Sequence, residues 1–560
     1  MLGSFFKAVY VAIQECEEGV VHMKYGIKFT SMAVALVAIL VIGGTSIAQN
    51  NSTVPGVDKT SIQGVSDSIG ISKVAAIIIP GTVDVRDFGA HSITEPGYEA
   101  FNSTDAFAAA SAAINAAGGG TLVLPANSIF IVGKQTLAGA KGKGYSYLPS
   151  KIIYIEDCTN KVVIEGNGSV LRTAPGLKFG SFDPITGLKS DHALPWTNQD
   201  NRADAYKGGM VYSQNNVSFE VKDLEMDGNI ANIDLGGQWG DTGYQCGGTG
   251  LKMINTKNII ATNIYTHHNP LDGLSIWTDS LTATDEKTPA VLTNVTSEYN
   301  ARQGMSWSGG IGLTATNCKF NHTGKAAFHS SPGAGLDIEA QNSVVRDGLF
   351  INCEFINNSG AGVVADSGDG GYTTFQNCTI WGTTNRALWP QKPFMRFEDC
   401  NIYGSVVNTW GSSNPAEATQ FIRCNFEDKP HPLYGIYNSG YLLDIGGDNV
   451  LFDGCTVINN TRRAIITNGV AGTVEKFKNC NFIFRWSATH DKEQQAIFRT
   501  SYLENVTFSD EIATPTPNGS FINVISCTIG QGVVVNGPTV KWKSWSPGAG
   551  GMLGTVPPTI

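Results

Sequence analysis

Apolar and polar residues alternate over short stretches through the C-terminal two thirds of the chain, with Asn, Gly, Ser and Thr between the stretches. This alternation is typical of strands that bury one face. Many stretches carry one motif: a residue that is usually polar, then Cys, any residue, and Phe, Ile or Val. The motif recurs at Cys318, Cys353, Cys378, Cys400, Cys424, Cys455, Cys480 and Cys527. Repeats of roughly 20–50 residues predict stacked supersecondary units.

Short strands on a recurring coil length, with no sustained helical period after about residue 150, predict a parallel β-helix. In such a fold the eight cysteines form one inward-facing column of small apolar thiols. Val295 and Ile264 take the same position in the units upstream. Because a side chain without a thiol is accepted there, we expect free thiols rather than disulfides. No CxxC or Cys/His spacing indicates a metal site in this series.

The segment 82–132 has a different pattern, which predicts a helical cap. A strand-like VDVRDFGA leads to the polar cluster Asn102-Ser103-Thr104-Asp105, an Ala-rich stretch at about 104–117 and three glycines. Polar residues before the stretch and glycine after it are typical of the two ends of a helix. An open solenoid exposes its end rung, so we expect this helix to cover the first rung.

The stretch DFGA…STDAFAAASAAINAAGGGTLVLP resembles the start of proteins of the pectate lyase-like (pectin lyase fold) right-handed parallel β-helix superfamily. That superfamily includes polysaccharide lyases, polygalacturonase-type glycoside hydrolases and phage tailspikes. VKDLEMDGN at 221–229 and NPLDGLSIW at 269–277 resemble its rungs, and the likeness covers about 82–530. The resemblance implies an all-β fold: a single-stranded right-handed parallel β-helix over 81–535 with an N-terminal capping helix. The NTD, DD, GHG and RIK strings of the polygalacturonase branch are absent, so the resemblance does not specify a mechanism.

The first 80 residues predict export. The stretch 31–48 is nearly all apolar, follows Lys24 and Lys28, and ends in a small-x-small site, as secretory signals do. We therefore expect a signal peptide at 1–48 (with the true start possibly at Met23), a linker at 49–80, and a C-terminal tail at 536–560. The mature protein would be secreted, periplasmic or at the cell surface, and not in the membrane.

Charge argues against nucleic acid as a partner. The 560 residues carry a net charge of −10, only 15% of them are charged, and we find no basic cluster. Phosphate backbones are bound mainly by clustered Lys and Arg. A polysaccharide is the expected partner, and the oligomeric state stays open.

Aligned strands of successive units predict which side chains share the outer wall. In the unit after Cys318, either AAFHSS (326–331) or AGLDIEA (334–340) could fill the strand position, and Gly335 favours the second. Asp337 and Glu339 would then lie beside Ser306 and Ser308 of the preceding unit. Val364 and Asp366 would lie on the following unit.

Three carboxylates, Asp337, Glu339 and Asp366, would thus meet within reach of one sugar ring. Neighbouring rungs are about 4.8 Å apart and alternate residues of a strand about 6.5–7 Å. Carboxyl groups that close raise at least one pKa, and pairs about 5–9.5 Å apart suit glycoside hydrolysis. We expect Glu339 and Asp366 to form the acid/base pair and Asp337 to contribute.

The sequence leaves other activities open. The same carboxylates could hold Ca²⁺ in a polysaccharide lyase acting on uronate polymers. Arg302, Lys325 or His329 would then be the base, whereas a hydrolase would need no cofactor. Trp277 and Trp389 are candidates for stacking on sugar rings, and Arg302 and Lys325 are further candidates for binding the substrate. A glycan-binding solenoid without activity is the third alternative.

Two further motifs are assigned no chemistry. His267 and His268 show no HxxxH or HExxH spacing, so no metal site is predicted at them. Asp227 and Asp272 each precede a glycine and are expected in turns.

Overall fold

The structure is a computed structural model that describes residues 81–141, 144–180, 186, 188–189, 209–236, 247–437, 440–468, 473–485, 494–511, 520–536, 540–546 and 549–554. The predicted signal peptide and linker lie outside these residues. Among the described helices, none is long and apolar enough to cross a membrane.

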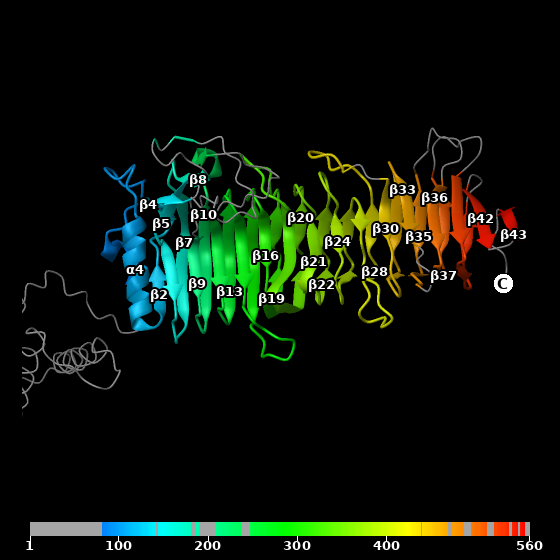
Figure 1. The fold of residues 1–560 in the computed structure, drawn as a ribbon, viewed down its shortest axis with the longest axis horizontal. Helices are drawn as coiled ribbons and strands as arrows, with labels where there is room; N and C mark the ends of the chain where they lie inside the picture. The colour runs from blue at the N-terminus through cyan, green and yellow to red at the C-terminus, as the bar shows by residue number, and fades with distance from the viewer. Residues whose placement is uncertain are drawn as a thin grey trace, which may run out of the picture. The chain divides into compact units, whose positions relative to one another are not determined.

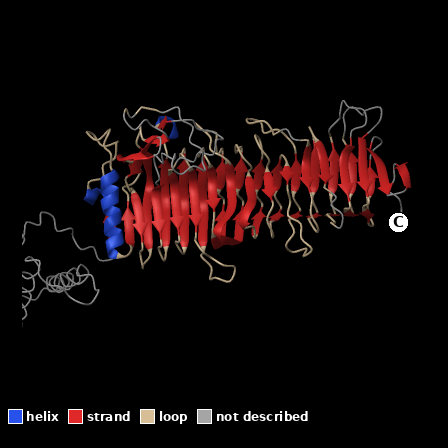
Figure 2. Cartoon of the chain, viewed as in Figure 1, coloured by secondary structure: helices blue, strands red, loops and turns tan. Residues whose placement is uncertain are grey.

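The described chain is a right-handed parallel β-helix, as the sequence and the resemblance predict (Figures 1 and 2). The turns of the solenoid stack into two long parallel sheets, here called sheet 1 and sheet 2. A turn adds one strand to sheet 1 and one long or two short strands to sheet 2. The strands of sheet 1 are β6 (Ile153–Glu156), β9 (Gly209–Gln214), β12 (Thr249–Ile254), β14 (Asp272–Trp277), β16 (Gln303–Trp307), β19 (Ala334–Ile351), β21 (Val363–Asp369), β24 (Leu388–Pro390), β27 (Val406–Val407), β30 (Tyr441–Ile445), β33 (Arg463–Thr467), β36 (Gln494–Arg499), β39 (Ser520–Ile525) and β42 (Val540–Ser546).

Sheet 2 covers the opposite wall, and β19 continues from sheet 1 into it. Its other strands are β1 (Thr82–Asp84), β2 (Gly120–Val123), β3 (Ile129–Val132), β7 (Val162–Thr173), β10 (Phe219–Asp227), β13 (Ile259–His267), β15 (Ala290–Glu298), β17 (Gly310–Thr316), β18 (Lys319–Asn321), β20 (Glu354–Ile356), β22 (Thr373–Gln376), β23 (Thr379–Trp381), β25 (Arg396–Glu398), β26 (Asn401–Tyr403), β28 (Gln420–Ile422), β29 (Asn425–Glu427), β31 (Leu451–Asp453), β32 (Thr456–Asn459), β34 (Lys476–Lys478), β35 (Asn481–Phe484), β37 (Tyr502–Glu504), β38 (Thr507–Asp510), β40 (Thr528–Ile529) and β41 (Val534–Asn536).

Five strands and two short helices lie outside this pattern. They are the antiparallel hairpin β4 (Gln135–Lys141) and β5 (Gly144–Pro149), the pair β8 (Lys178–Gly180) and β11 (Asp234–Gly236), the last strand β43 (Ala549–Gly554), and the 3₁₀-helices η1 (Val85–Phe88) and η3 (Ile230–Asn232). Within the expected tail at 536–560, β42 pairs in parallel with β39, and β43 pairs antiparallel with β42. The stacked sheet therefore extends beyond residue 535.

The helix α4 (Thr104–Ala117) covers the N-terminal end of the solenoid (Figure 1). Phe107 packs edge-on against Phe130 with ring centroids 5.2 Å apart, inside the common core. Gly118 ends the helix in the left-handed conformation, as the three glycines predict. At the start, the Asn102 side chain accepts a hydrogen bond from the Thr104 amide at 3.1 Å.

The repeated motif marks a kink in the backbone that is followed by a core residue, the cysteine. In seven of its eight occurrences, the residue before the cysteine has a positive φ and is not glycine, for example Asn317 (φ 55°) and Asn377 (φ 53°). Asn adopts this left-handed conformation more readily than most residues, which explains why it recurs there. From the rung of Cys318 to that of Cys480, the kink separates two short strands of sheet 2 and turns the cysteine inward. Upstream, β10, β13 and β15 run through such kinks as single strands.

Seven of the eight motif cysteines, from Cys318 to Cys480, form the predicted inward column, and Val506 continues it on the next rung. The prediction was wrong for Cys527, which lies over Ser501 in a different column. The nine cysteines within the described residues are all free, and each motif cysteine donates its thiol to a carbonyl of the preceding rung, as Cys378 does to Phe350 at 3.4 Å. A parallel column of rings lies beside it: Phe350, Phe375, Phe397, Phe421, Phe452 and Phe477 have successive centroids 4.7–5.1 Å apart.

Two thiols outside this column, those of Cys158 and Cys527, are expected to be unreactive while the protein is folded. Burial raises the pKa of Cys158 and of Cys527 to about 11, so at pH 8 only about one thiol in a thousand at each position is the reactive thiolate. Peptide mapping after iodoacetamide treatment at pH 8 should show both alkylated in urea and protected in buffer. Equal alkylation in both conditions would contradict the burial of these two thiols.

Candidate active site

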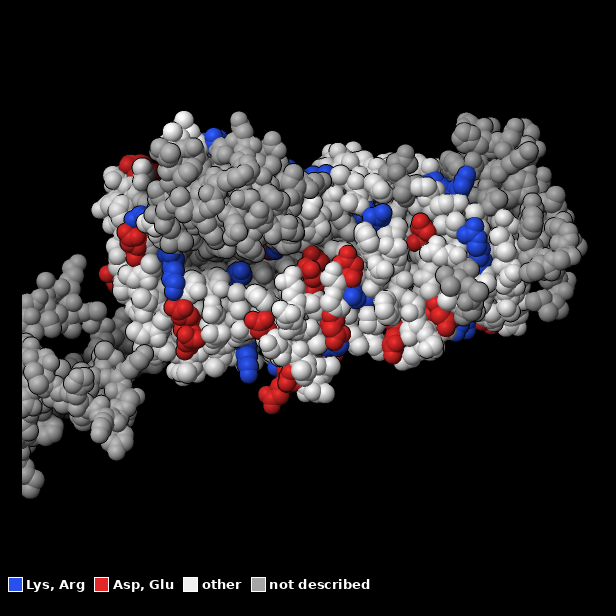
Figure 3. Space-filling view, viewed as in Figure 1, with Lys and Arg blue, Asp and Glu red and all other residues white. Residues whose placement is uncertain are grey.

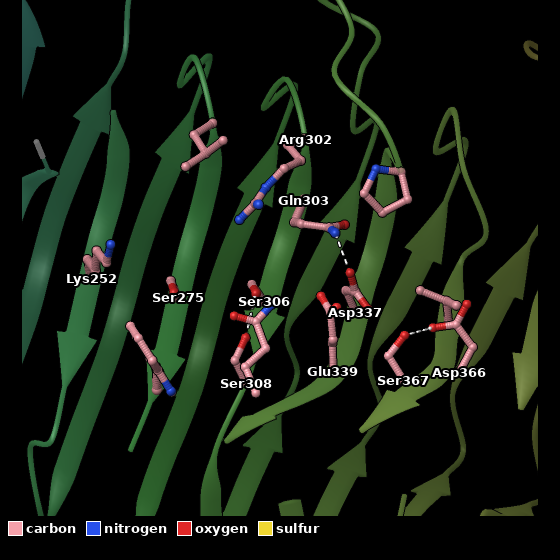
Figure 4. Close-up of a pocket in the computed structure, with 15 residues that line it drawn as sticks. Lys252, Ser275, Arg302, Gln303, Ser306, Ser308, Asp337, Glu339, Asp366 and Ser367 are labelled. Carbon is pink, nitrogen blue, oxygen red and sulfur yellow. Dashed lines mark hydrogen bonds between the residues drawn. The ribbon is translucent and has the colours of Figure 1, made fainter. Parts of the chain in front are cut away.

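The outer face of sheet 1 carries a hollow of about 530 Å³ (Figure 4). Its wall is made by β12, β14, β16, β19 and β21 of sheet 1, and its upper rim by the corners that lead into these strands. The lining side chains are those of Lys252, Leu271, Ser275, Trp277, Arg302, Gln303, Ser306, Ser308, Pro332, Asp337, Glu339, Gln341, Val364, Asp366 and Ser367.

Strand register places the outward residues of successive rungs in one column. Its members, from the N-terminal side, are Lys252, Ser275, Ser306, Asp337, Val364 and Trp389. The register that puts AGLDIEA over QGMSWS is therefore the one observed. Gly335 helps to fix it, because a Cβ there would lie 2.6 Å from both the Asn358 amide nitrogen and the Gly362 carbonyl oxygen.

The register between β19 and β21 shifts close to Asp366, the third predicted carboxylate. Asp337 pairs with Val364 as predicted, but Glu339 pairs with Ser367 rather than with Asp366. A β-bulge inserts one residue into one strand of a pair, and this residue is left unpaired. Asp366 is that residue: it is exposed and accepts a hydrogen bond from the Ser367 hydroxyl at 2.8 Å. All three predicted carboxylates still line the hollow.

Asp337 is the buried member of the three. Its relative exposure is 6%, and its Oδ2 accepts a hydrogen bond from Gln303 Nε2 at 2.5 Å. Gln303 Oε1 accepts a bond from the Ala334 amide at 3.1 Å, which fixes the amide group. Burial, and next the charge of Glu339, raises the pKa of Asp337 to about 8. This carboxyl group is therefore mostly protonated at neutral pH.

Arg302 forms a two-pronged ion pair with Asp272. Its Nε donates to Oδ1 at 2.7 Å and its Nη2 to Oδ2 at 2.5 Å. Asp272 is 1% exposed and begins strand β14, so it is a buried counter-ion rather than a turn residue. Arg302 lines the hollow as predicted, and its positive charge acts to lower the pKa of Asp337 against the effect of burial.

The two predicted tryptophans are placed differently. Trp277 is half-buried and lines the hollow, and its indole nitrogen has no hydrogen-bond partner among the described residues. Trp389 pairs with Val364 on the next rung and is not part of the lining. Its indole nitrogen donates to Gln391 at 3.0 Å, and the Arg386 guanidinium lies 4.8 Å from its ring centroid.

Lys325 and His329 belong to the loop between β18 and β19 and do not line the hollow. Lys325 donates to the Thr384 hydroxyl. The His329 ring packs so closely on Gly333 that a Cβ there would lie 2.5 Å from Nε2. Pro332 brings this loop to the rim of the hollow, and the roles of the two basic residues stay predictions.

Lys252 and Gln303 line the hollow and were not predicted from the sequence. Extending the alignment one unit upstream, to TGLKMI at 249–254, would have placed Lys252 in the column. Gln303 aligns with Asp272 at the start of its strand, but its bond to Asp337 depends on side-chain conformation.

The hollow combines a protonated acid with two further carboxyl groups, so it is suited to acid/base chemistry. The three carboxylates of the hollow form a less compact candidate cation site than a cluster elsewhere on the chain. Among the described residues, three ligand atoms within 4.8 Å of one another occur at Asp227, His267 and His268 and not at the three carboxylates.

Charges elsewhere on the surface are mixed. On the face shown in Figure 3, the acidic and basic side chains of the described residues are interspersed along the solenoid. This distribution lacks the basic stripe that is typical of nucleic-acid-binding surfaces.

Comparisons with known proteins concern the fold. The family described as "Right handed beta helix region" matches residues 207–380. No curated protein matches the sequence. One similar structure is the A-module of a mannuronan C-5 epimerase from Azotobacter vinelandii, with 15% identity, 80% of this chain and 99% of that chain covered, and a TM-score of 0.43.

Two others are more distant. The tailspike protein of E. coli bacteriophage HK620 has 12% identity, covers 89% of this chain and 83% of its own, and has a TM-score of 0.37. An endo-xylogalacturonan hydrolase from Aspergillus tubingensis has 13% identity, covers 83% and 95%, and has a TM-score of 0.25.

Proposed function

We propose that this protein is a glycoside hydrolase that cleaves a polysaccharide in the hollow on sheet 1. The observation that carries the proposal is Asp337, a buried carboxyl group with a pKa raised to about 8 beside Glu339. Carboxyl groups whose environments separate their pKa values form acid and base pairs at neutral pH. Cleavage of a glycosidic bond needs such a pair.

In this proposal Asp337 is the general acid and Glu339 is the base that activates water. These roles differ from those expected from the sequence, where Asp337 only contributed, because Asp337 is the carboxyl group that burial keeps protonated. The Cα atoms of alternate residues of a strand are about 6.6 Å apart, so the two side chains occupy neighbouring outward positions of β19, as a pair that acts on one glycosidic bond requires. Asp366 is exposed and adds negative charge on the next rung.

The remaining lining groups would hold the sugar. Ser275, Ser306 and Ser308 offer hydroxyl groups, and the Trp277 indole offers an apolar face. These residues come from adjacent rungs, so a polymer lying along the solenoid axis would contact them in turn. The hydrolase would need no cofactor.

A polysaccharide lyase is the second candidate, and one observation favours it. Two cations, Lys252 and Arg302, line the hollow together with the carboxylates, which suits the binding of a uronate carboxylate. This mechanism would involve Ca²⁺ at the carboxylates, as the sequence analysis anticipates.

We also propose that the protein is exported, with 1–48 removed. Amino-terminal sequencing of the protein recovered outside the cytoplasm should then begin near Gln49. Recovery of the intact chain from the cytoplasm alone would contradict export and would leave the proposed chemistry unaffected.

A polysaccharide panel assayed for new reducing ends and for ultraviolet absorbance tests the activity. A hydrolase releases reducing ends without absorbance, whereas a lyase produces unsaturated, absorbing ends. Glu339→Gln should lose most of the rate, and Asp399→Asn should keep it. Asp399 is the matched control because it is an exposed carboxylate, paired with Arg423 on sheet 2. Retardation of a polysaccharide without any product would indicate a binding protein and refute the proposal.

Gln303→Leu is expected to move the basic limb of the pH–rate profile to higher pH. The variant removes a donor that favours ionised Asp337, so the pKa of this acid rises. Lost orientation should also lower kcat by about tenfold or more. Ser306→Ala, in the same wall, should leave the position of the limb unchanged. A limb that moves to lower pH would contradict the assignment of Asp337 as the acid.

A further inference from the structure

A second cluster of polar side chains lies where β10 and β13 end. Asp227 and His267 are register partners on these neighbouring strands of sheet 2. His268 follows with a left-handed backbone (φ 54°) and presents its ring to His267. One ligand atom of each of the three residues lies within 4.8 Å of the others.

The hydrogen bonds of His267 determine which of its nitrogens is available. Its Nε2 lies 3.3 Å from Glu225 Oε1, and its Nδ1 lies 2.7 Å from His268 Nδ1 and 3.9 Å from Asp227 Oδ1. A carboxylate that accepts the proton of one ring nitrogen leaves the lone pair on the other. Metal-binding histidines commonly have this kind of carboxylate partner.

All three side chains are held in place before any ligand arrives. The Tyr265 ring stacks on His267 at 4.2 Å between centroids, and the Tyr299 ring stacks on His268 at 5.2 Å. The Asp227 and His267 side chains are only 14% and 10% exposed.

Asp227 keeps one oxygen for a ligand. Its Oδ2 accepts a bond from Arg172 Nε at 2.8 Å, and its Oδ1 accepts one from the Asn229 amide at 2.9 Å while facing the two rings. A carboxylate oxygen has a second lone pair available. The Arg172 cation neutralises the carboxylate without metal and so reduces the affinity for one.

We propose that Asp227, His267 and His268 form a site for a divalent transition metal ion, with Zn²⁺ as the best match. Two imidazole nitrogens and one carboxylate oxygen are a donor set that Zn²⁺ accepts, with water as a fourth ligand. Ca²⁺ and Mg²⁺ prefer oxygen ligands only. Zn–N distances of about 2.1 Å require the two Nδ1 atoms to separate by roughly 0.6 Å. The ion would tie two rungs together at a corner that the proposed hydrolase chemistry does not use.

Titration calorimetry with Zn²⁺ on the full-length protein, without a histidine tag and after dialysis against chelator, tests this site. One ion per chain is expected. His268→Asn, which suits the left-handed backbone, and Asp227→Asn should each weaken binding at least tenfold. Glu225→Gln should weaken it by about 10–100-fold by freeing the orientation of His267. His322→Asn is the matched control, because His322 has the same backbone conformation (φ 57°) and stacks on the other side of Tyr299.

A second measurement keeps the test valid if a variant does not fold. The electron paramagnetic resonance spectrum of Cu²⁺ added to the parent protein should show two coupled nitrogens, and Ca²⁺ in excess should not displace the ion. The site is refuted if no Zn²⁺ binds, if the variants bind as well as the parent, or if the Cu²⁺ spectrum lacks nitrogen coupling. None of these outcomes depends on polysaccharide cleavage.

Discussion

Asp337→Asn is expected to lower kcat for polysaccharide cleavage by about 10³-fold, within the usual contribution of a general acid. The amide keeps the size of the carboxyl group and can still contact Gln303, but it has no proton to give to the leaving oxygen. The loss should be smallest with substrates whose leaving group needs no protonation, such as activated aryl glycosides. An equal loss on both substrate types would contradict the role of Asp337 as the acid.

The same residue predicts a pH dependence. On the alkaline side of the profile, activity that needs protonated Asp337 should disappear as the pH rises through about 8. The free energy of unfolding also depends on pH. Because the pKa of Asp337 is raised in the folded state, the folded state binds this proton more tightly than the unfolded state. Asp337 therefore destabilises the fold increasingly from about pH 4 to pH 8. Asp337→Asn should remove this dependence and raise the Tm at pH 8, which distinguishes lost chemistry from lost folding.

Arg302→Met is expected to destabilise the fold by about 3–5 kcal/mol, the usual cost of leaving one charge of a buried pair without its partner. Met keeps the apolar stem, while Asp272, at 1% exposure, loses both guanidinium bonds. Urea unfolding measures the change. Activity should also fall, because Arg302 lies on the rim of the hollow.

The double variant Arg302→Met/Asp272→Asn is the control for this prediction. Removing both charges should recover most of the lost stability, since no buried charge then remains unpaired. If the single variant costs less than about 1 kcal/mol, the pair behaves like an exposed ion pair, and the predicted cost of leaving Asp272 without its partner is wrong.

Periodicity was sufficient to predict the fold. The repeated motif predicted stacked rungs and an inward thiol column, and the pattern at 104–117 predicted α4 with its Gly118 end. The kink in each rung was not recognised, although the residue that forms it belongs to the motif. A preference for Asn indicates a left-handed backbone only once the strand boundaries are known.

The candidate site could be predicted as far as strand register determines it. Asp337 and Glu339 follow from alternation and one glycine, and they lie where expected. The bulge that displaces Asp366 and the bonds from Gln303 to Asp337 and from Arg302 to Asp272 depend on local strain and side-chain reach. An alignment of the repeat units shows neither local strain nor side-chain reach. The buried acid, Asp337, was therefore evident only in the structure.

The two ends of the solenoid are covered by different elements, a helix at one end and an antiparallel strand at the other. Helix α4 covers the first rung, and β43 runs against the direction of every rung below it. A second copy therefore finds no parallel strand to extend at either end. Truncation before Ala549 would leave β42 as a bare parallel edge, and such edges promote strand-to-strand association. Because α4 still covers the other end, the shortened protein should pair edge to edge and form dimers at high concentration more readily than the parent.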